Sequence, residues 1–262
     1  MPTFALELEF DGAGYAGTAL QRDQRTVQGE LRRALERIDG PGALTRSSGR
    51  LDAGVHAEAL VVSCILSKDW EPGALGRAIN GNLDHDCRVL RVAAVAEGWD
   101  ALQAKSRKTY AYRVIERAAA PALERRSWHW RRLVFPQHLQ TCAHALVGEH
   151  DLSAFAGLRN DGSDSGDPVR KYAAAGWSSA PLPGGGTEWT FCITGLGFLY
   201  KQVRGLVGGQ IAVAMGQHSL DEFLAAIGAG RSHPKIGQMA PSEGLRLERV
   251  AYRSPPAWQA LF

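Results

Sequence analysis

The sequence predicts an α+β protein built from two similar halves, each with a mainly antiparallel sheet flanked by helices. The chain has 262 residues, of which 45% are hydrophobic and 22% charged, so it can bury a sizeable core. Strand-like and helical patterns follow one another as β, α, β, α, β in about the first hundred residues. The order β, α, β, β, α follows in the rest, although no exact sequence repeat links the two parts. We place the division between residues 1–104 and residues 105–262.

The first half opens with a strand and a turn. TFALELEF, Thr3 to Phe10, alternates apolar and polar side chains and predicts a half-buried strand. DGAGYAG, Asp11 to Gly17, is a glycine-rich turn that lacks the G-x-x-x-x-G-K-[ST] spacing of a phosphate-binding loop. Thr26 can cap a helix that apolar spacing predicts as far as about Ile38. The half continues with a strand at 60–66, a helix at 72–80 and a strand at 87–96.

The second half has the same kind of order. KTYAYRVIE, 108–116, predicts a strand, and PQHLQTCAHALVG, 136–148, predicts a helix with Val147 among its inward residues. Ser219 and Glu222 make a capping box for a later, short helix. The remaining expected elements are a polar, mobile loop at 157–167, hairpin strands at 172–180 and 187–195, helices at 198–215 and 219–227, and a strand at 245–252.

Basic charge is concentrated in one segment. The formal net charge is only +3, which by itself does not indicate a nucleic-acid-binding protein. Residues 105–132, however, contain nine basic side chains against two acidic ones, interleaved with tyrosines and tryptophans. This mixture suits phosphates and stacked bases, but a solvated basic face with aromatic residues in the core explains the pattern equally well. The basic residues are Lys105, Arg107, Lys108, Arg113, Arg117, Arg125, Arg126, Arg131 and Arg132.

Cysteine usage and the chain start favour a cytoplasmic protein. The four cysteines stand far apart without a C-x-x-C motif, so neither a zinc site nor a disulfide framework is indicated. MPTFALELEF lacks the basic and apolar regions of a signal peptide, and no apolar run of about 18 residues occurs. His138, His144 and His150 repeat every six residues, which scatters their rings around a helix and argues against a metal site. The cysteines are Cys64, Cys87, Cys142 and Cys192.

One carboxylate stands out by its setting. SSGRLDAGVHAEA, Ser47 to Ala59, places Asp52 between Arg50 and Gly54 on a flexible loop. A carboxylate acts as a nucleophile or general base only while ionised, and a neighbouring guanidinium keeps it ionised by lowering its pKa. Arg204 is a candidate partner, because FLYKQVRGLVGGQ has the apolar stripe of an internal helix, where an arginine needs a partner. Spacing alone does not link the two residues.

Eight motifs in a fixed order carry a resemblance to a known family. They are EFDGAGYAG with TVQGEL near the start, GRLDAGVHA at 49–57, INGNL at 79–83, KTYAYRV at 108–114, LVGEHDLSAF at 146–155, DPVRK at 167–171, FLYKQVRGLVGGQIAVAMGQ at 198–217 and APSEGLRLERVAY at 240–252. With these motifs the sequence resembles the tRNA pseudouridine synthase A family nearly from end to end. A single motif is only moderately specific for the family, whereas eight motifs in the same order are highly specific for it.

The resemblance implies an isomerase that turns selected tRNA uridines into pseudouridine. Such an enzyme breaks the glycosidic bond and rejoins the base to the ribose through carbon. The family acts on positions 38, 39 and 40 of the anticodon stem-loop without a metal or an organic cofactor. The resemblance also implies a homodimer whose two subunits form the tRNA-binding clefts. The expected fold is the pseudouridine synthase fold, with two halves of the RNA-recognition-motif or ferredoxin-like type.

The resemblance assigns roles to particular residues. Asp52 matches the catalytic nucleophile, and Arg204 matches the arginine that forms an ion pair with it. Tyr110 matches a tyrosine that stacks on the target base and is a candidate for moving the proton of its C5. Arg50 matches an arginine that helps to extrude the nucleotide, which must leave the stem to react. The expected substrate-binding residues are Arg50, Tyr110, Lys108, Arg107 and His56.

Each assignment has a structural alternative. Asp52 could be a turn residue, Tyr110 a core aromatic and Arg50 a surface charge or a phosphate contact. His56 is tempting as a general base, but the chemistry already has one, so we interpret it mainly as a residue that fixes the loop. The alternative function is a non-catalytic tRNA-binding protein or RNA chaperone on the same scaffold. Such a protein would have no need of Asp52, Tyr110 and Arg204 together.

Several positions depart from the usual pattern of the family. Leu51 replaces the threonine before the catalytic aspartate, and Thr18 replaces the tryptophan after Y-x-G. The other departures are His85 for a proline, Leu102 for an arginine, Ala156 for an arginine and Gln202 for a methionine. They spare the three residues expected to carry the chemistry and remove polar or RNA-facing groups around them.

Overall fold

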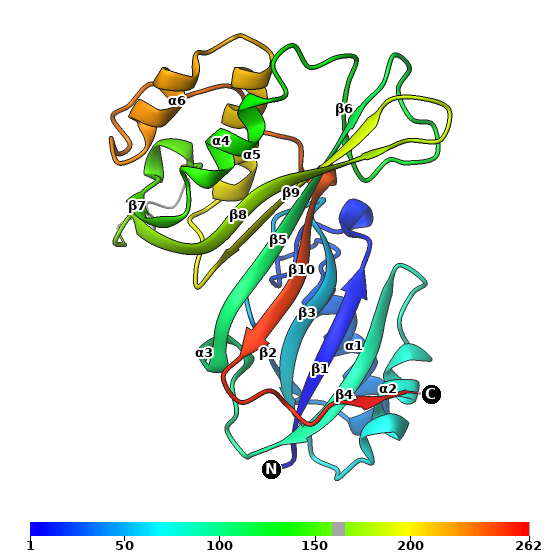
Figure 1. Ribbon diagram of the computed structural model, residues 1–262. Helices are drawn as coiled ribbons and strands as arrows, with labels where there is room; N and C mark the ends of the chain where they lie inside the picture. Colours follow the sequence, from blue (N-terminus) through cyan, green and yellow to red (C-terminus); the bar gives the residue numbers. More distant parts are fainter. Residues whose placement is uncertain (159–165, 262) are drawn as a thin grey trace. The chain divides into compact units, whose positions relative to one another are not determined.

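The computed structural model describes residues 1–158 and 166–261, and Figure 1 shows its helices and strands. The chain divides into two compact units. The first is Met1–Lys108 with the segment from Arg246 onward, and the second is Thr109–Leu245. The predicted α+β class is confirmed, because each unit combines a mostly antiparallel sheet with helices. The assignment of separate functional parts to residues 1–104 and 105–262 stays a prediction.

The sheet of the first unit is centred on its N-terminal strand. Its strands are β1 (Thr3–Phe10), β2 (Leu44–Ser47), β3 (His56–Ile65), β4 (Cys87–Val95), β10 (Leu245–Tyr252) and β11 (Gln259–Ala260). β1 pairs antiparallel with β3 on one side and with β4 on the other, and β2 pairs antiparallel with β3. The returning C-terminal segment adds β10 parallel to β3 and β11 antiparallel to β4. These pairings are the reason why the end of the chain belongs to this unit.

β1 is buried more fully than the alternation predicted, and the expectation of a half-buried strand is wrong. Glu7 is only 8% exposed, although the pattern placed it on the outer face. Its carboxylate accepts two hydrogen bonds from the guanidinium of Arg91 on β4, with N–O distances of 2.7 and 2.6 Å. This charge-assisted pair satisfies the carboxylate, which is why a glutamate can lie in the central strand. Glu9 is the exposed residue of the strand.

Two helices pack against the sheet of the first unit. α1 (Val27–Asp39) begins after Thr26, whose side-chain oxygen accepts a hydrogen bond from the N–H of Gly29 at 3.2 Å. The predicted cap is therefore confirmed. α2 (Pro72–Asn80) has the predicted bounds and packs beside α1 and on β4. Figure 1 shows both helices on the same side of the sheet. Their fully buried residues include Leu31, Leu35, Leu75 and Ile79.

The sheet of the second unit contains the predicted hairpin. Its strands are β5 (Lys105–Glu116), which begins in the first unit, β6 (Trp128–Trp130), β7 (Gly148–Asp151), β8 (Val169–Pro181) and β9 (Thr187–Gly195). β8 and β9 are antiparallel, with Pro181 opposite Thr187, so the hairpin is confirmed. β9 lies between β5 and β8, and β7 pairs antiparallel with β8. β6 pairs parallel with β5.

Three helices gather on one side of β8 and β9 (Figure 1). They are α4 (His138–His144), α5 (Gln202–Ala214) and α6 (Leu220–Ala226). α5 begins at Gln202 rather than at 198, because Lys201 has a φ of 54°, a left-handed conformation that a helix cannot include. α4 ends before Val147, which was expected to point inward but is 42% exposed. The predicted capping box at the start of α6 is confirmed.

The sequence did not predict the short strands β2, β6, β7 and β11, or the short helix α3 (Ala101–Ala104). It also did not predict the 3₁₀ helices η1 (Gly12–Gly14), η2 (Ser153–Phe155) and η3 (Ser242–Gly244). Most of the loop expected at 157–167 falls on residues 159–165, which lie outside the described residues. None of the helices in the described part of the chain has the length and apolar character needed to cross a membrane. No disulfide links the four cysteines, all of which are described.

Candidate active site

The loop of residues 48–55, called the Asp52 loop below, connects β2 to β3 in the first unit. Asp52 is half-buried at its centre. Gly54 has a φ of 77°, a left-handed conformation that favours glycine. Gly49 serves a different purpose, because a Cβ at this residue would lie 2.9 Å from the Nζ atom of Lys108. Lys108 is only 8% exposed and packs against the start of the loop, where glycine leaves room for it.

A second loop, the glycine-rich loop of residues 11–18, packs on the Asp52 loop. The N–H of Gly54 donates a hydrogen bond to the carbonyl of Tyr15 at 3.3 Å. A Cβ on Gly12 would lie 2.1 Å from the carbonyl oxygen of Val55, so the two backbones touch where glycine has no side chain. The glycine-rich turn predicted from the sequence therefore serves a close backbone contact.

His56 joins the two loops. Its side chain is 8% exposed, and its Nδ1 lies 3.0 Å from the backbone nitrogen of Gly12 and 3.0 Å from the carboxylate of Asp11. An unprotonated Nδ1 accepts from the N–H of Gly12, whereas a protonated Nδ1 donates to Asp11. Either way, the ring connects the start of β3 to the glycine-rich loop. This geometry supports the interpretation of His56 as a loop-fixing residue, and its role in substrate binding stays a prediction.

Arg25 ties the glycine-rich loop to the start of β4. Its guanidinium lies over the ring of Tyr15, 4.2 Å from the centroid, and donates to the carboxylate of Asp86 at 2.8 Å. The hydroxyl of Tyr15 donates to the same carboxylate at 2.8 Å. The hydrogen bond from Arg25, with help from Tyr15 and against the effect of partial burial, holds the pKa of Asp86 below its usual range. No local pattern in the sequence signals this network, which joins residues far apart in the chain.

Two further candidates of the first unit lie at the surface. Arg50 on the Asp52 loop and Arg107 on β5 are both exposed. Their guanidinium groups can therefore reach a phosphate or a base without displacing other parts of the unit. Their roles in substrate binding stay predictions.

In the second unit, Tyr110 is part of a row of three aromatic rings. It lies on β5 and is 5% exposed. Tyr110 and Phe198 make an edge-to-face contact, with ring centroids 4.9 Å apart and ring planes at 81°. Phe198 in turn stacks on Tyr172 with centroids 5.1 Å apart and planes at 25°. The packing fixes the plane of the Tyr110 ring. Phe198 begins the segment FLYKQVRGLVGGQ, but no local pattern in the sequence signals its contact with Tyr110.

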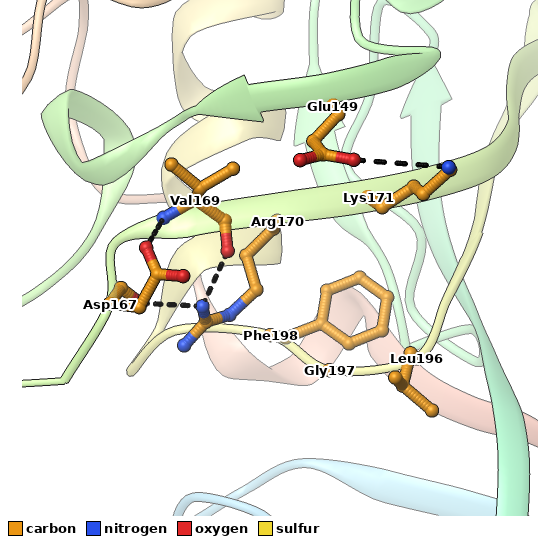
Figure 2. Close-up of a pocket in the computed structure, with 8 residues that line it drawn as sticks. All are labelled: Glu149, Asp167, Val169, Arg170, Lys171, Leu196, Gly197 and Phe198. Atoms are coloured by element: carbon orange, nitrogen blue, oxygen red, sulfur yellow. Dashed lines mark hydrogen bonds and ion pairs between the residues drawn. The ribbon is translucent and has the colours of Figure 1, made fainter.

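A pocket of about 370 Å³ opens beside this row in the second unit (Figure 2). The Phe198 ring forms part of its wall, and the Arg170 guanidinium donates hydrogen bonds of 2.6 Å to the carbonyls of Asp167 and Val169. The ammonium of Lys171 lies 3.8 Å from the carboxylate of Glu149. The lining residues are Glu149, Asp167, Val169, Arg170, Lys171, Leu196, Gly197 and Phe198. The pocket thus combines an aromatic wall with cations and carboxylates.

Arg204 lies on α5 and is half-buried, as the apolar stripe of this helix predicted. Its Nε donates a hydrogen bond to the carbonyl of Ala240 at 2.7 Å, and its own carbonyl accepts one from the N–H of Ala240 at 3.2 Å. The helix can approach neighbouring backbone because it carries glycines. A Cβ on Gly205 would lie 1.8 Å from the carbonyl oxygen of Phe155. The hydrogen bond from Nε to the carbonyl of Ala240 holds the side chain of Arg204 against the backbone.

Comparison with known proteins identifies the family. The chain is 34% identical over 254 residues to tRNA pseudouridine synthase A of Caulobacter sp. (strain K31), covering 96% of this chain and 98% of that protein. It is also 34% identical over 254 residues to tRNA pseudouridine synthase A of Xanthobacter autotrophicus, covering 96% of this chain and 100% of that one. The chain belongs to the tRNA pseudouridine synthase A family. A family model described as tRNA pseudouridine synthase matches residues 142–253 of this family member.

Membership in the tRNA pseudouridine synthase A family confirms the resemblance found in the motifs and identifies an enzyme family of isomerases. A chain in the crystal structure of a Cbf5-Nop10-Gar1 complex gives a TM-score of 0.35 at 12% identity, covering 95% of this chain and 60% of that one. Among the described residues of this family member, no group of three or more His, Cys, Asp or Glu side chains could hold a metal ion. The roles of Asp52, Arg204 and Tyr110 stay predictions.

Proposed function

We propose that this protein is a tRNA pseudouridine synthase that converts uridine to pseudouridine at positions 38, 39 and 40 of the anticodon stem-loop. The observation that carries the proposal is its similarity, over 96% of the chain, to a relative named tRNA pseudouridine synthase A. The assignment to positions 38, 39 and 40 of the tRNA is supported by the resemblance of the sequence motifs to those of the family. The reaction is an isomerisation, so its atoms and electrons balance without a co-reactant.

The reaction exchanges one bond for another. The bond between N1 of uracil and C1′ of ribose breaks, a bond between C5 and C1′ forms, and a proton leaves C5 while N1 gains one. We assign to the carboxylate of Asp52 the first step, either by attack on C1′ or by promoting departure of the uracil. The backbone contacts that hold the Asp52 loop support this role, because a nucleophile must be held in place to act.

We assign Tyr110 to packing against the uracil and to moving the proton of C5, and Arg204 to an ion pair with Asp52. The contact of Tyr110 with Phe198 supports the first role, because a ring held in one plane suits stacking on a base. The hydrogen bond from Arg204 to Ala240 supports the second role. A guanidinium fixed at Nε directs its remaining N–H groups, and these suit a carboxylate.

The target nucleotide must leave the stacked stem before it can react. We assign Arg50 to the space that the extruded nucleotide leaves, and its exposure on the Asp52 loop supports this role. Arg107 is exposed in the same way and is assigned to the RNA backbone. Lys108 and His56 are buried and would act on the RNA through the loop that they hold.

We further propose that the enzyme works as a cytoplasmic homodimer, as the family resemblance implies. Light scattering on the purified protein without tRNA should give twice the chain mass. A single-chain mass would contradict the dimer and would leave the reaction itself unaffected.

The activity is tested by mapping pseudouridine in unmodified tRNA transcripts after incubation with the purified protein. Transcripts with uridine at position 38, 39 or 40 should gain pseudouridine there, and matched transcripts with cytidine at these positions should gain none. Pseudouridine only at other positions would refute the assignment to the anticodon stem-loop. Binding of tRNA without any pseudouridine would instead establish the alternative, a tRNA-binding protein or RNA chaperone.

A further inference from the structure

We infer that Thr18 is a positioning residue for Asp52. It binds both backbone polar groups of Leu51, the residue before the carboxylate. The N–H of Leu51 donates to Oγ1 of Thr18 at 2.9 Å, and the N–H of Thr18 donates to the carbonyl of Leu51 at 3.1 Å. Two bonds to one partner fix both the position and the orientation of this part of the chain. The inference rests on the role proposed above for Asp52.

Burial makes the hydroxyl of Thr18 necessary. Thr18 is 1% exposed and Leu51 is 8% exposed, so water does not readily replace either hydrogen bond. A buried N–H without an acceptor is costly, and the hydroxyl oxygen of Thr18 is the acceptor of the Leu51 N–H. Without that hydroxyl, the segment that leads into Asp52 would have to shift until its N–H found another acceptor.

Thr18 is itself fixed to a rigid element. Its carbonyl accepts a hydrogen bond from the N–H of Gln28 at 3.0 Å, and the carbonyl of Gly17 accepts one from the N–H of Val27 at 3.2 Å. Both donors lie in the first turn of α1. The position of α1 is therefore transmitted through Thr18 to Leu51 and from there to Asp52.

The test compares three variants in pseudouridine formation on a tRNA transcript, with kcat and KM measured separately. Thr18→Val keeps the shape of the side chain but removes the hydroxyl, and we expect kcat to fall about 10- to 100-fold with KM nearly unchanged. Thr18→Ser restores the hydroxyl and should recover most of kcat. Thr3→Val is the control, because Thr3 is 3% exposed and its hydroxyl also bonds to the backbone, in this case by donating to the carbonyl of Met1. It should leave kcat unchanged.

The results separate this inference from the proposed function. A wild-type protein that makes no pseudouridine refutes the function, whatever the variants do. An active wild type together with a folded Thr18→Val variant of normal kcat, or one changed only in KM, overturns the role of Thr18. If Thr18→Val does not fold, amide hydrogen exchange in the wild type decides. The two hydrogen bonds between Thr18 and Leu51 predict that the Leu51 amide is strongly protected from exchange. Exchange as fast as in an exposed loop would overturn the inference.

Discussion

At the scale of single residues, glycines that let two loops pack closely help to set the position of Asp52. Gly17 has a φ of 102°, and a Cβ at this residue would lie 2.7 Å from the carbonyl oxygen of Leu51. Gly12 approaches Val55 even more closely. A methyl group at either glycine would push the glycine-rich loop away from the Asp52 loop. The geometry of the candidate nucleophile therefore depends on glycines in another part of the chain.

Gly17→Ala can be tested against Gly42→Ala, because the two glycines have nearly the same φ, 102° and 99°. A Cβ on Gly42 meets nothing within 4 Å, whereas one on Gly17 meets Leu51. Both variants should lose about 1–2 kcal/mol of unfolding free energy from the strained φ. Only Gly17→Ala should also lower kcat, by about tenfold or more. Thermal unfolding and steady-state assays measure the two effects, and equal kcat values in both variants would refute the role of this contact.

Motifs in the sequence indicate candidate residues, whereas a contact between distant parts of the chain leaves no local signal. Asp52 and Tyr110 stand in recognisable motifs, and His56 is expected to fix the loop because the proposed chemistry already has its base. The sequence shows Thr18 only as a departure from the family pattern, because its partner Leu51 is 33 residues away. The contact of Phe198 with Tyr110 has no local signal either, since it joins β5 to the segment before α5.

At the scale of elements, local signals predicted most helices and strands. α2 has the predicted bounds, α1 begins at its predicted cap, and the β8–β9 hairpin forms where PLPGGG predicts a turn. The errors arise where tertiary contacts or backbone geometry decide. β1 buries a glutamate because β4 supplies an arginine, and α5 starts late because the residue before it is left-handed. Short strands such as β6 carry too few residues for a periodic signal.

The link between the glycine-rich loop and β4 should depend on pH through Asp86. The folded state holds the pKa of this carboxylate below its usual range, so the charged form stabilises the fold above about pH 4. That contribution is lost as the pH falls through the folded-state pKa. Asp86→Asn should lower the unfolding free energy at pH 7 by about 1–3 kcal/mol. The difference from the wild type should shrink toward pH 3 in urea unfolding curves.

Asp84→Asn is the matched control for this prediction. Asp84 pairs with the same Arg25 at 3.0 Å, but its side chain is 67% exposed, against 18% for Asp86. Its loss should cost less than about 1 kcal/mol, because exposed ion pairs contribute little. Equal losses in the two variants, or a loss in Asp86→Asn that does not change with pH, would contradict the assigned role of Asp86.

At the scale of the whole molecule, the distribution of charge matters more for tRNA binding than the net charge of +3. Not all basic residues of segment 105–132 are at the surface. Lys108 is buried, and Arg113 pairs with Glu188 and with Glu124. The neighbouring arginines of the second unit are exposed and are better placed to meet phosphate groups. They are Arg125, Arg126, Arg131 and Arg132.

Replacing Arg131 and Arg132 together by glutamine should weaken tRNA binding and flatten its dependence on salt. Each lost phosphate contact reduces the slope of log K against log salt by about 1, so the pair should reduce it by about 2. The matched control replaces Arg32 and Arg33, two adjacent exposed arginines on α1, whose side chains are 50% and 61% exposed. Filter binding at several salt concentrations measures both slopes. An unchanged slope in the first variant would place the tRNA elsewhere.

In the proposed function, the carboxylate of Asp52 carries the chemistry and the basic surface carries the affinity for tRNA. Asp52→Asn separates the two, because it removes the charge while keeping the size of the side chain. Asp69→Asn, at an exposed loop residue of the same unit, controls for the substitution itself.

The most direct measurement is pseudouridine formation by Asp52→Asn on an unmodified tRNA transcript, with the Kd for the same transcript measured in parallel. We predict no detectable pseudouridine and a Kd within about threefold of the wild type, and Asp69→Asn should behave as the wild type in both respects. Normal turnover by Asp52→Asn would show that this carboxylate does not carry the reaction.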